Sequence, residues 1–335
     1  MLVLLIILAL FYAFLNGYRD SSSILAGVLA SRAIPPRWAL LLVGAIDLVA
    51  PFLFGSAVAR AITTGLVDIH AVTLDTIVIA MLAALAWSLI SWWQGIPSSS
   101  THALVGGLLG AVLITHGPQA ILGSGLVKVL LPLILAPALG LAAGYLVMSL
   151  LLYFLRDAHP KVNTPLRRFQ ILTMLLLAMS ESSNDAQKSM GIIALGLFLA
   201  GATASFTIPL WVLAACAAAL AFGASRGDWR QIRNLGGKIY HIRPLDALAS
   251  QVAASTVILS ASALGMPVSS PHVISTALLG AGASERVNKV RWQVATRMVT
   301  TWVVTIPATM VVSALLFGAI SLVQGLGGGL PLLLH

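Results

Sequence analysis

Two short polar segments, each built around an aspartate, interrupt apolar stretches of this chain. The first reads NGYRDSSS over residues 16–23, and the second reads ESSNDAQKS over residues 181–189. A carboxylate among apolar residues is costly, so it usually marks an ion or substrate site. Oxygen ligands of this kind suit Na⁺, and a carboxyl group can also take up a proton. We therefore predict a site for Na⁺ or H⁺, formed by Asn16, Asp20, Glu181, Asn184, Asp185 and Gln187.

A second pair of segments reads GIPSSSTH over residues 95–102 and GMPVSSPH over residues 265–272. Each places hydroxyl groups and, after a proline, unpaired backbone N–H groups at the start of an apolar stretch. The N-terminus of a helix binds oxyanions well, and two facing termini would hold a tetrahedral anion from both sides. Ordinary helix capping by serine is the alternative for each segment alone. The hydroxyl groups predicted to bind the anion belong to Ser99, Ser100, Thr101, Ser269 and Ser270.

An anion site next to carboxylates needs cations, which is the physical basis of cation-coupled anion symport. Arg19 precedes Asp20 and Lys188 follows Asp185. These fixed positive charges would repel Na⁺, so the sequence favours H⁺ slightly over Na⁺ as the coupling ion. The alternative is that Arg19 and Lys188 form purely structural ion pairs with the aspartates.

Four further polar side chains lie in or beside apolar stretches. His102 and His272 follow the serine segments, and packing and proton transfer are equally compatible with their positions. Asp47 and Asp246 have less informative surroundings, and pairing with an arginine is slightly favoured for both.

The elements that position these residues must be membrane-spanning helices. The chain is 59% hydrophobic and 9% charged, with a mean hydropathy of +0.99. This composition excludes a soluble fold. The net charge of +9 lies mostly in short loops, where it sets membrane orientation, so nucleic-acid binding is not expected. The single cysteine, Cys216, excludes a disulfide framework and a cysteine metal site.

Ten apolar segments are long enough to be considered as membrane helices or half-helices. Their approximate ranges are 1–31, 38–60, 72–93, 98–115 and 119–155, then 169–200, 206–224, 246–264, 267–283 and 292–326. We expect the two segments that follow Gly-x-Pro to be half-helices or re-entrant hairpins. The two longest are expected to contain two helices or a kink near Pro132, Pro137 or Pro307. The first segment is expected to be a retained span, and roughly ten to twelve transmembrane helices are expected in all.

The chain repeats itself, and its basic loops fix an orientation. Segment 95–111 matches segment 265–281 at one constant offset, and Asp20 and Asp185 are separated by nearly the same length of chain. Basic residues cluster in alternate loops: Arg32 and Arg37; Arg156, Lys161, Arg167 and Arg168; Arg226, Arg230, Arg233, Lys238 and Arg243; Arg286, Lys289, Arg291 and Arg297. We predict that these loops are cytoplasmic and that both termini lie outside. We further predict two inverted repeats, 1–155 and 169–335, joined by a cytoplasmic linker over 156–168.

Four motifs in order resemble those of the inorganic phosphate transporter (PiT) family. They are NGYRD, PSSSTH, NDAQKSMG and PVSSPH, and TWVVTIPA over 301–308 extends the likeness to nearly the whole chain. The resemblance implies an inverted-repeat membrane transporter, not an enzyme, that moves orthophosphate with Na⁺ or H⁺. It implies that Asp20 and Asp185 serve both the cation and the anion. The implied anion site also contains the serine and threonine hydroxyls above, and we add Ser23 and Lys188 to it.

The chain departs from the family pattern at five positions. Arg19, Ser23, Glu181, Ser182 and Pro271 replace residues that are common there, which leaves the coupling ion and the choice between phosphate and sulfate open. A membrane-embedded hydrolase using Ser99 or Ser100 with His102 is a remote alternative, because neither serine lies in a Gly-x-Ser-x-Gly motif and the sequence has no HExxH motif. We expect no cofactor besides the coupling ion. Phosphate or sulfate and membrane lipid are the expected partners, in a prokaryotic plasma membrane, and a homo-oligomer is left open.

Overall fold

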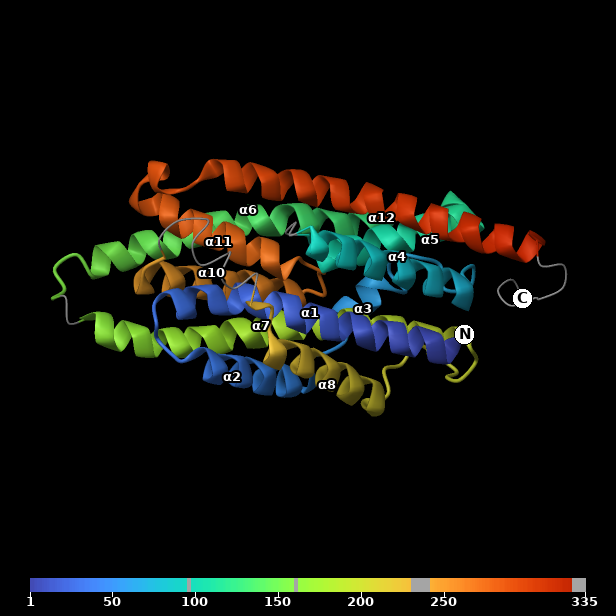
Figure 1. Cartoon of the computed structure of the whole chain (residues 1–335), viewed down its shortest axis with the longest axis horizontal. Helices are drawn as coiled ribbons and strands as arrows, with labels where there is room; N and C mark the ends of the chain where they lie inside the picture. Colours follow the sequence, from blue (N-terminus) through green and yellow to red (C-terminus); the bar gives the residue numbers. More distant parts are fainter. Residues whose placement is uncertain (95–97, 160–161, 230–241, 327–335) are drawn as a thin grey trace.

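The computed structural model describes residues 1–94, 98–159, 162–229 and 242–326, and these residues fold into closely packed helices (Figure 1). The first half contains α1 (Leu2–Ala30), α2 (Pro36–Val49), η1 (Ala50–Phe52), α3 (Ala57–Ile62), α4 (Leu74–Trp93), α5 (Ser100–His116), η2 (Pro118–Ala120) and α6 (Gly123–Phe154). The second half contains α7 (Asn163–Leu199), α8 (Leu210–Arg226), α10 (Pro244–Ala263), α11 (Ser270–Glu285), η4 (Val287–Lys289) and α12 (Trp292–Leu326). Five of these helices have segments that are long and apolar enough to cross a membrane: α1, α4, α6, α10 and α12. The expected all-helical, polytopic membrane fold is confirmed.

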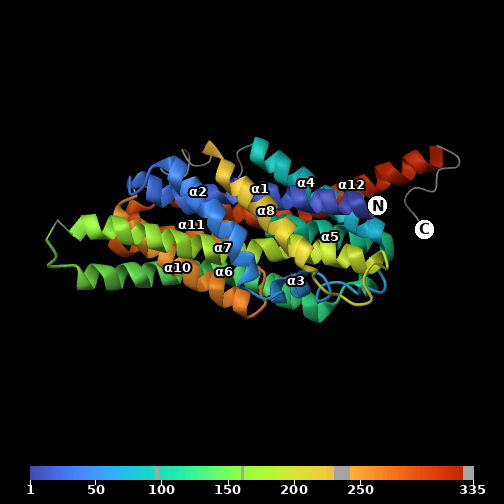
Figure 2. The same cartoon turned by 90° about the horizontal axis from the view of Figure 1, so that it is seen from below.

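The molecule has two distinct ends. Helix α1 begins and α12 ends at one of them, which we call the terminal end (Figure 1). The connections α1–α2, α6–α7 and α11–α12 lie at the opposite end, which we call the basic end because it holds Arg32, Arg156 and Arg286. Figure 2 shows the same separation of the two ends from below. Three of the four basic loops of the sequence therefore lie, in their described parts, at one end of the fold.

Helices α4 and α5 form a hairpin that enters from the terminal end. Its open end is held there by the Leu122 N–H, which donates to the Leu66 carbonyl at 3.0 Å. Helices α10 and α11 form a second hairpin from the basic end. There Arg243 forms an ion pair with Glu285, and Lys289 forms one with Asp246 at 3.0 Å. The two segments that follow Gly-x-Pro are thus each one arm of a helical hairpin, and the two hairpins point toward each other.

Each hairpin packs against the last helix of the other half. Helix α5 lies against α12, and α11 lies against α6. Glycines at equivalent positions permit this approach, since a Cβ at Gly110 would lie 2.5 Å from the Met310 Cα and one at Gly280 would lie 2.0 Å from the Leu141 oxygen. Small residues let helix backbones meet closely in membranes, where van der Waals packing is a principal attraction.

One expectation about helix continuity is wrong, and for the two longest segments one of the two expected alternatives is excluded. Segment 38–60 is not one helix, because α2 ends at Val49 and Pro51 follows in the short helix η1. Proline lacks the N–H that would continue the helix. The segments around 119–155 and 292–326 do not divide into two helices either. Each is a single helix that contains its prolines, Pro132 and Pro137 in α6 and Pro307 in α12.

Some residues named in the sequence predictions lie outside the described part of the structure. They are Gly95 and Pro97 before α5, and Lys161, Arg230, Arg233 and Lys238 in the basic loops.

Candidate functional site

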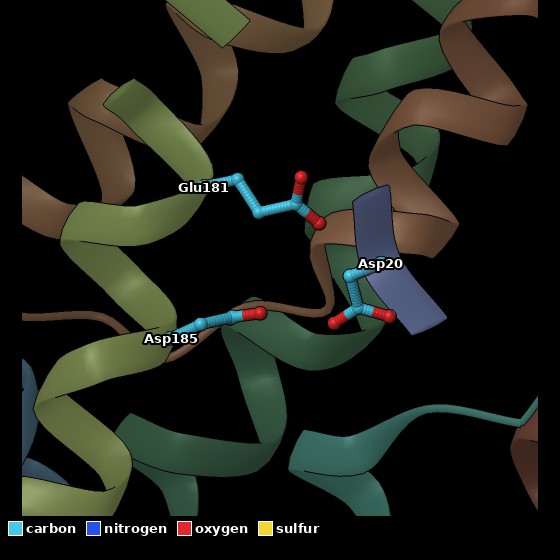
Figure 3. Close-up of side chains that lie close together, drawn as sticks. All are labelled: Asp20, Glu181 and Asp185. Carbon is cyan, nitrogen blue, oxygen red and sulfur yellow. The ribbon is translucent and has the colours of Figure 1, made fainter. Parts of the chain in front are cut away.

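Three carboxyl groups meet in the interior of the molecule. Asp20 comes from α1, and Glu181 and Asp185 come from successive turns of α7. One oxygen from each lies within 4.8 Å of one from each of the others, and all three side chains point into the same space (Figure 3). Their exposed fractions are 9%, 4% and 1%. The two aspartate motifs, one from each half of the sequence, are therefore brought together by the packing of α1 on α7.

A small cavity lies beside these carboxyl groups. Its polar lining consists of Asn16, Asp20, Ser21, Asp47, Glu181, Ser182 and Asp185. Several of the atoms there are buried without a hydrogen-bond partner among the described residues. These atoms are Asn16 Nδ2, Asp20 Oδ2, Glu181 Oε1 and Oε2, and Asp185 Oδ2. Buried polar groups are normally hydrogen-bonded, so this concentration of unpaired atoms marks a place where a ligand would complete the site.

The local charge balance is strongly negative. Lys188 lies one turn beyond Asp185 on α7 and its Nζ forms an ion pair with Asp185 Oδ1, with both side chains 1% exposed. If Asp20, Glu181 and Asp185 were all ionised, this lysine would pair with only one of the three charges. Two charges 4.8 Å apart repel by about 3.5 kcal/mol at an effective dielectric constant of about 20. Bound protons or a metal cation would relieve this repulsion.

Arg19 does not play the same part in the first half. Its guanidinium donates to the carbonyl of Ser88 at 3.3 Å and to that of Ser98 at 3.2 Å. Arg19 therefore holds the tip of the α4–α5 hairpin against α1. Among the described residues it forms no ion pair with Asp20, so the structural pairing considered for both halves is found only at Asp185 and Lys188.

The amide side chains predicted as cation ligands separate into two groups. Asn16 lines the cavity. Asn184 instead donates to Ser262 Oγ at 3.1 Å and holds the tip of the α10–α11 hairpin. Gln187 accepts from the Val58 N–H at 2.9 Å and so caps the short helix α3. Of these three amides, Asn16 is therefore the one that lies with the carboxyl groups.

The N-termini of α5 and α11 meet near the centre of the fold, as the serine segments predict. Thr101 Oγ1 donates to the Val268 carbonyl at 2.9 Å, which joins the two hairpin tips. Ser270 Oγ donates to Asp185 Oδ1 at 3.4 Å, which joins α11 to the carboxyl cluster. In α1, Tyr12 Oη donates to the Ser100 carbonyl at 2.6 Å. The hydroxyl-rich helix termini and the carboxyl groups are therefore parts of one central region.

The two serines that precede the helices are in different states. Ser99 caps α5, accepting from the His102 N–H at 3.2 Å, and its Oγ also contacts His102 Nδ1 at 2.8 Å. Ser269 Oγ is buried without a hydrogen-bond partner among the described residues. Pro271 lies in the first turn of α11, where its missing N–H removes no intrahelical bond. Capping thus explains the position of Ser99, whereas the Ser269 hydroxyl could donate a hydrogen bond to a ligand.

His102 and His272 come together although they are far apart in sequence. Their ring centroids are 5.1 Å apart, and the His272 ring stacks on Trp302 of α12 with centroids 4.1 Å apart. Both imidazoles are buried. The two imidazole rings connect the first turns of α5 and α11. Of the two roles considered for these histidines, packing and proton transfer, the ring contacts support packing.

Three other predicted residues have clear positions. Asp246 is paired with Arg243 and Lys289, as expected. Asp47 has no ion pair with an arginine among the described residues and instead lines the cavity, so the slight preference for pairing is wrong there. The sequence signal that would have pointed to this role is a carboxylate inside an apolar segment. Ser23 is partly buried and is not part of the cavity lining.

Comparison with known proteins agrees with this geometry. Residues 16–313 match the model of the phosphate transporter family. The chain is 38% identical to a probable low-affinity inorganic phosphate transporter of Bacillus subtilis, over 96% of this chain and 97% of that protein. It is 37% identical to a protein of the same description in Rhizobium meliloti, with the same coverage. A putative phosphate permease of Pyrococcus furiosus is 24% identical over 97% of both chains.

A solved structure has the same fold. The chain described as the sodium-dependent phosphate transporter superposes with a TM-score of 0.86, covering 96% of this chain and 99% of that one at 22% identity. The matched family and relatives are transporters and not enzymes. The family match covers most of the sequence and includes the carboxyl cluster and both hairpin tips, and we conclude that this chain is a membrane protein of the phosphate transporter family.

Proposed function

We propose that this protein carries inorganic phosphate across the plasma membrane together with cations, by alternating access to the central region. One observation carries the proposal. Three buried carboxyl groups with unpaired oxygens lie beside two hydroxyl-rich helix N-termini, and among the described residues Lys188 is the ion-pair partner of just one of them. An anion can bind next to carboxyl groups only when cations bind with it. The family and its bacterial relatives support phosphate as that anion and the plasma membrane as the location.

In this proposal the anion is held where α5 and α11 begin. Ser269 and Ser270 would donate hydroxyl hydrogen bonds, while the helix termini would contribute partial positive charge. Ser99, Ser100 and Thr101 would complete the site after the hairpin tips separate, since Thr101 now binds the Val268 carbonyl. A carboxylate in the same region would accept the proton of HPO₄²⁻, which sulfate lacks. This hydrogen bond is the reason to place phosphate before sulfate.

We propose H⁺ as the coupling ion, with Na⁺ as the alternative. Lys188 already neutralises Asp185, and Asn184 and Gln187 have other partners, so the cavity offers few neutral oxygen ligands to a metal ion. The unpaired oxygens of Asp20 and Glu181 could nevertheless hold Na⁺ together with Asn16. When bound there, Na⁺ would supply the same neutralising charge as a proton.

We also propose that the chain consists of two inverted repeats, 1–155 and 169–335, joined by residues 156–168, with both termini outside. Each half supplies one hairpin, and the two hairpins enter from opposite ends. Two helix contacts support this symmetry. Helix α5 of the first half packs against α12, the last helix of the second half, and α11 of the second half packs against α6, the last helix of the first. Rocking of the hairpins would then expose the central region to each side in turn.

Purified protein in liposomes tests the function. Uptake of radiolabelled phosphate should follow an imposed pH gradient, and excess unlabelled sulfate should compete poorly. Uptake that requires a Na⁺ gradient and does not respond to the pH gradient would identify Na⁺, and not H⁺, as the coupling ion. Absence of phosphate uptake under both gradients would contradict the proposed function.

A further inference from the structure

The interface between α1, α7 and α10 near the basic end contains a line of buried polar side chains, which we call the polar seam. It consists of Ser31 at the end of α1, Gln170 and Thr173 of α7, and Gln251 and Ser255 of α10. Their exposed fractions range from 0% at Gln170 to 7% at Thr173. Such side chains are unusual inside a packed apolar fold unless they have a task.

Hydrogen bonds across the seam join three helices. Ser31 Oγ donates to Gln170 Oε1 at 2.6 Å, which connects α1 with α7. Thr173 Oγ1 donates to Gln251 Oε1 at 2.7 Å, which connects α7 with α10. Two donors are left over, because Gln251 Nε2 and Ser255 Oγ are buried without a hydrogen-bond partner among the described residues.

The seam extends from the basic end toward the carboxyl cavity. Gln170 and Gln251 each lie seven residues after the first residue of their helix, which is about 10 Å along the axis at about 1.5 Å per residue. Asp185 lies fifteen residues beyond Gln170 on α7, or about 22 Å. Ser262, which is hydrogen-bonded to Asn184, is the next buried polar side chain on α10 after Ser255, and the apolar Ile258 lies between them.

The equivalent positions in the other half are apolar. At the offset that relates Asp20 to Asp185, the counterpart of Gln170 is Leu5. At the offset that relates His102 to His272, the counterparts of Gln251 and Ser255 are Met81 and Leu85. These three apolar side chains are buried in the same hydrophobic cluster. Separating this apolar interface exposes hydrocarbon to water, whereas water can replace the hydrogen bonds of the polar seam.

We propose that the polar seam is the path by which phosphate passes between the carboxyl cavity and the basic end, with Gln251 Nε2 and Ser255 Oγ forming a weak transit site for the anion. This inference rests on the proposed function. Neutral amide and hydroxyl donors suit such a site, because they bind an oxyanion without the strong attraction of a lysine or arginine that would retain it. Of the two interfaces, the apolar one at Leu5 and Met81 is the stronger barrier to water and to the anion.

Cysteine labelling tests the path. The wild-type chain is a low-background control, because Cys216 is completely buried. We compare Ser255→Cys with Leu85→Cys, its counterpart in the other half, in vesicles of both orientations. An anionic, membrane-impermeant thiosulfonate is the reagent. Asp157→Cys identifies the basic-end face, since the Asp157 side chain is 86% exposed at the α6–α7 connection.

At the face that labels Asp157→Cys, Ser255→Cys should react about tenfold faster than Leu85→Cys, a factor that corresponds to about 1.4 kcal/mol. Saturating phosphate should slow the labelling of Ser255→Cys. Equal reactivity of the two variants at this face, or an inert Ser255→Cys in a protein that still transports phosphate, would overturn the proposed path.

A second pair of variants needs no thiol chemistry. Gln251→Met introduces the methionine that the other half has at the equivalent position, Met81. This change should slow phosphate exchange and leave equilibrium phosphate binding unchanged. Met81→Gln is the matched reverse change, and it should leave exchange through the basic end at the wild-type rate. Wild-type exchange in Gln251→Met would count against the transit site. If phosphate is not transported but Ser255→Cys still reacts at the basic-end face, the proposed substrate fails and the aqueous path is supported.

Discussion

Replacing Asp20 by asparagine is the most direct test of the carboxyl cluster. Asp20 Oδ2 has no hydrogen-bond partner among the described residues, so an isosteric amide should leave folding intact. The change removes one negative charge from a group whose ligand atoms lie within 4.8 Å of one another. A cation at that separation would lose about 3.5 kcal/mol of attraction at an effective dielectric constant of about 20, or roughly 300-fold in affinity.

The assay is the initial rate of gradient-driven phosphate uptake in proteoliposomes, measured against the concentration of the coupling cation. Asp20→Asn should show no measurable coupled uptake, while its elution volume and unfolding temperature match those of wild type. Asp157→Asn, at an exposed site outside the cluster, is the control and should transport normally. The reasoning is refuted if well-folded Asp20→Asn transports at the wild-type rate with an unchanged cation dependence.

Three further predictions follow from the packing. Lys188→Met should lower the free energy of unfolding by about 3–5 kcal/mol, because it leaves Asp185 buried without its partner, and adding Asp185→Asn should restore part of the loss in a thermal unfolding assay. Ser269→Ala should weaken phosphate affinity by about 1–3 kcal/mol without changing the unfolding temperature, because its hydroxyl has no partner among the described residues; an unchanged affinity argues against its role. Gly280→Ala should lower the free energy of unfolding by about 1–3 kcal/mol, because the new Cβ would meet the Leu141 oxygen. Gly318→Ala is the control, because open space surrounds that position, and equal unfolding temperatures for the two variants would show that α11 and α6 can move apart freely.

Much of the architecture was predictable from the sequence. Apolar segments of sufficient length identify the helices, and their bounds agree within a few residues for most, such as 246–264 against Pro244–Ala263 in α10. The hairpins were predicted because Gly-x-Pro interrupts each half at matched positions. Most residues of the candidate site could also be named from residue type, since carboxylates and clustered serines are costly inside apolar segments unless they bind an ion or a substrate.

The partners of individual side chains were decided only by the tertiary structure. Asn184 and Gln187 have the same ligand chemistry as Asn16, yet the packing of α7 turns them toward the α10–α11 tip and α3. Asp47 and Asp246 look alike in sequence. Asp246 lies at the base of the α10–α11 hairpin, where it pairs with Arg243 and Lys289, whereas Asp47 lines the cavity. A sequence determines which groups a helix carries. The rotation of that helix against its neighbours decides which of them share a cavity, because side chains that interact there come from residues far apart along the chain.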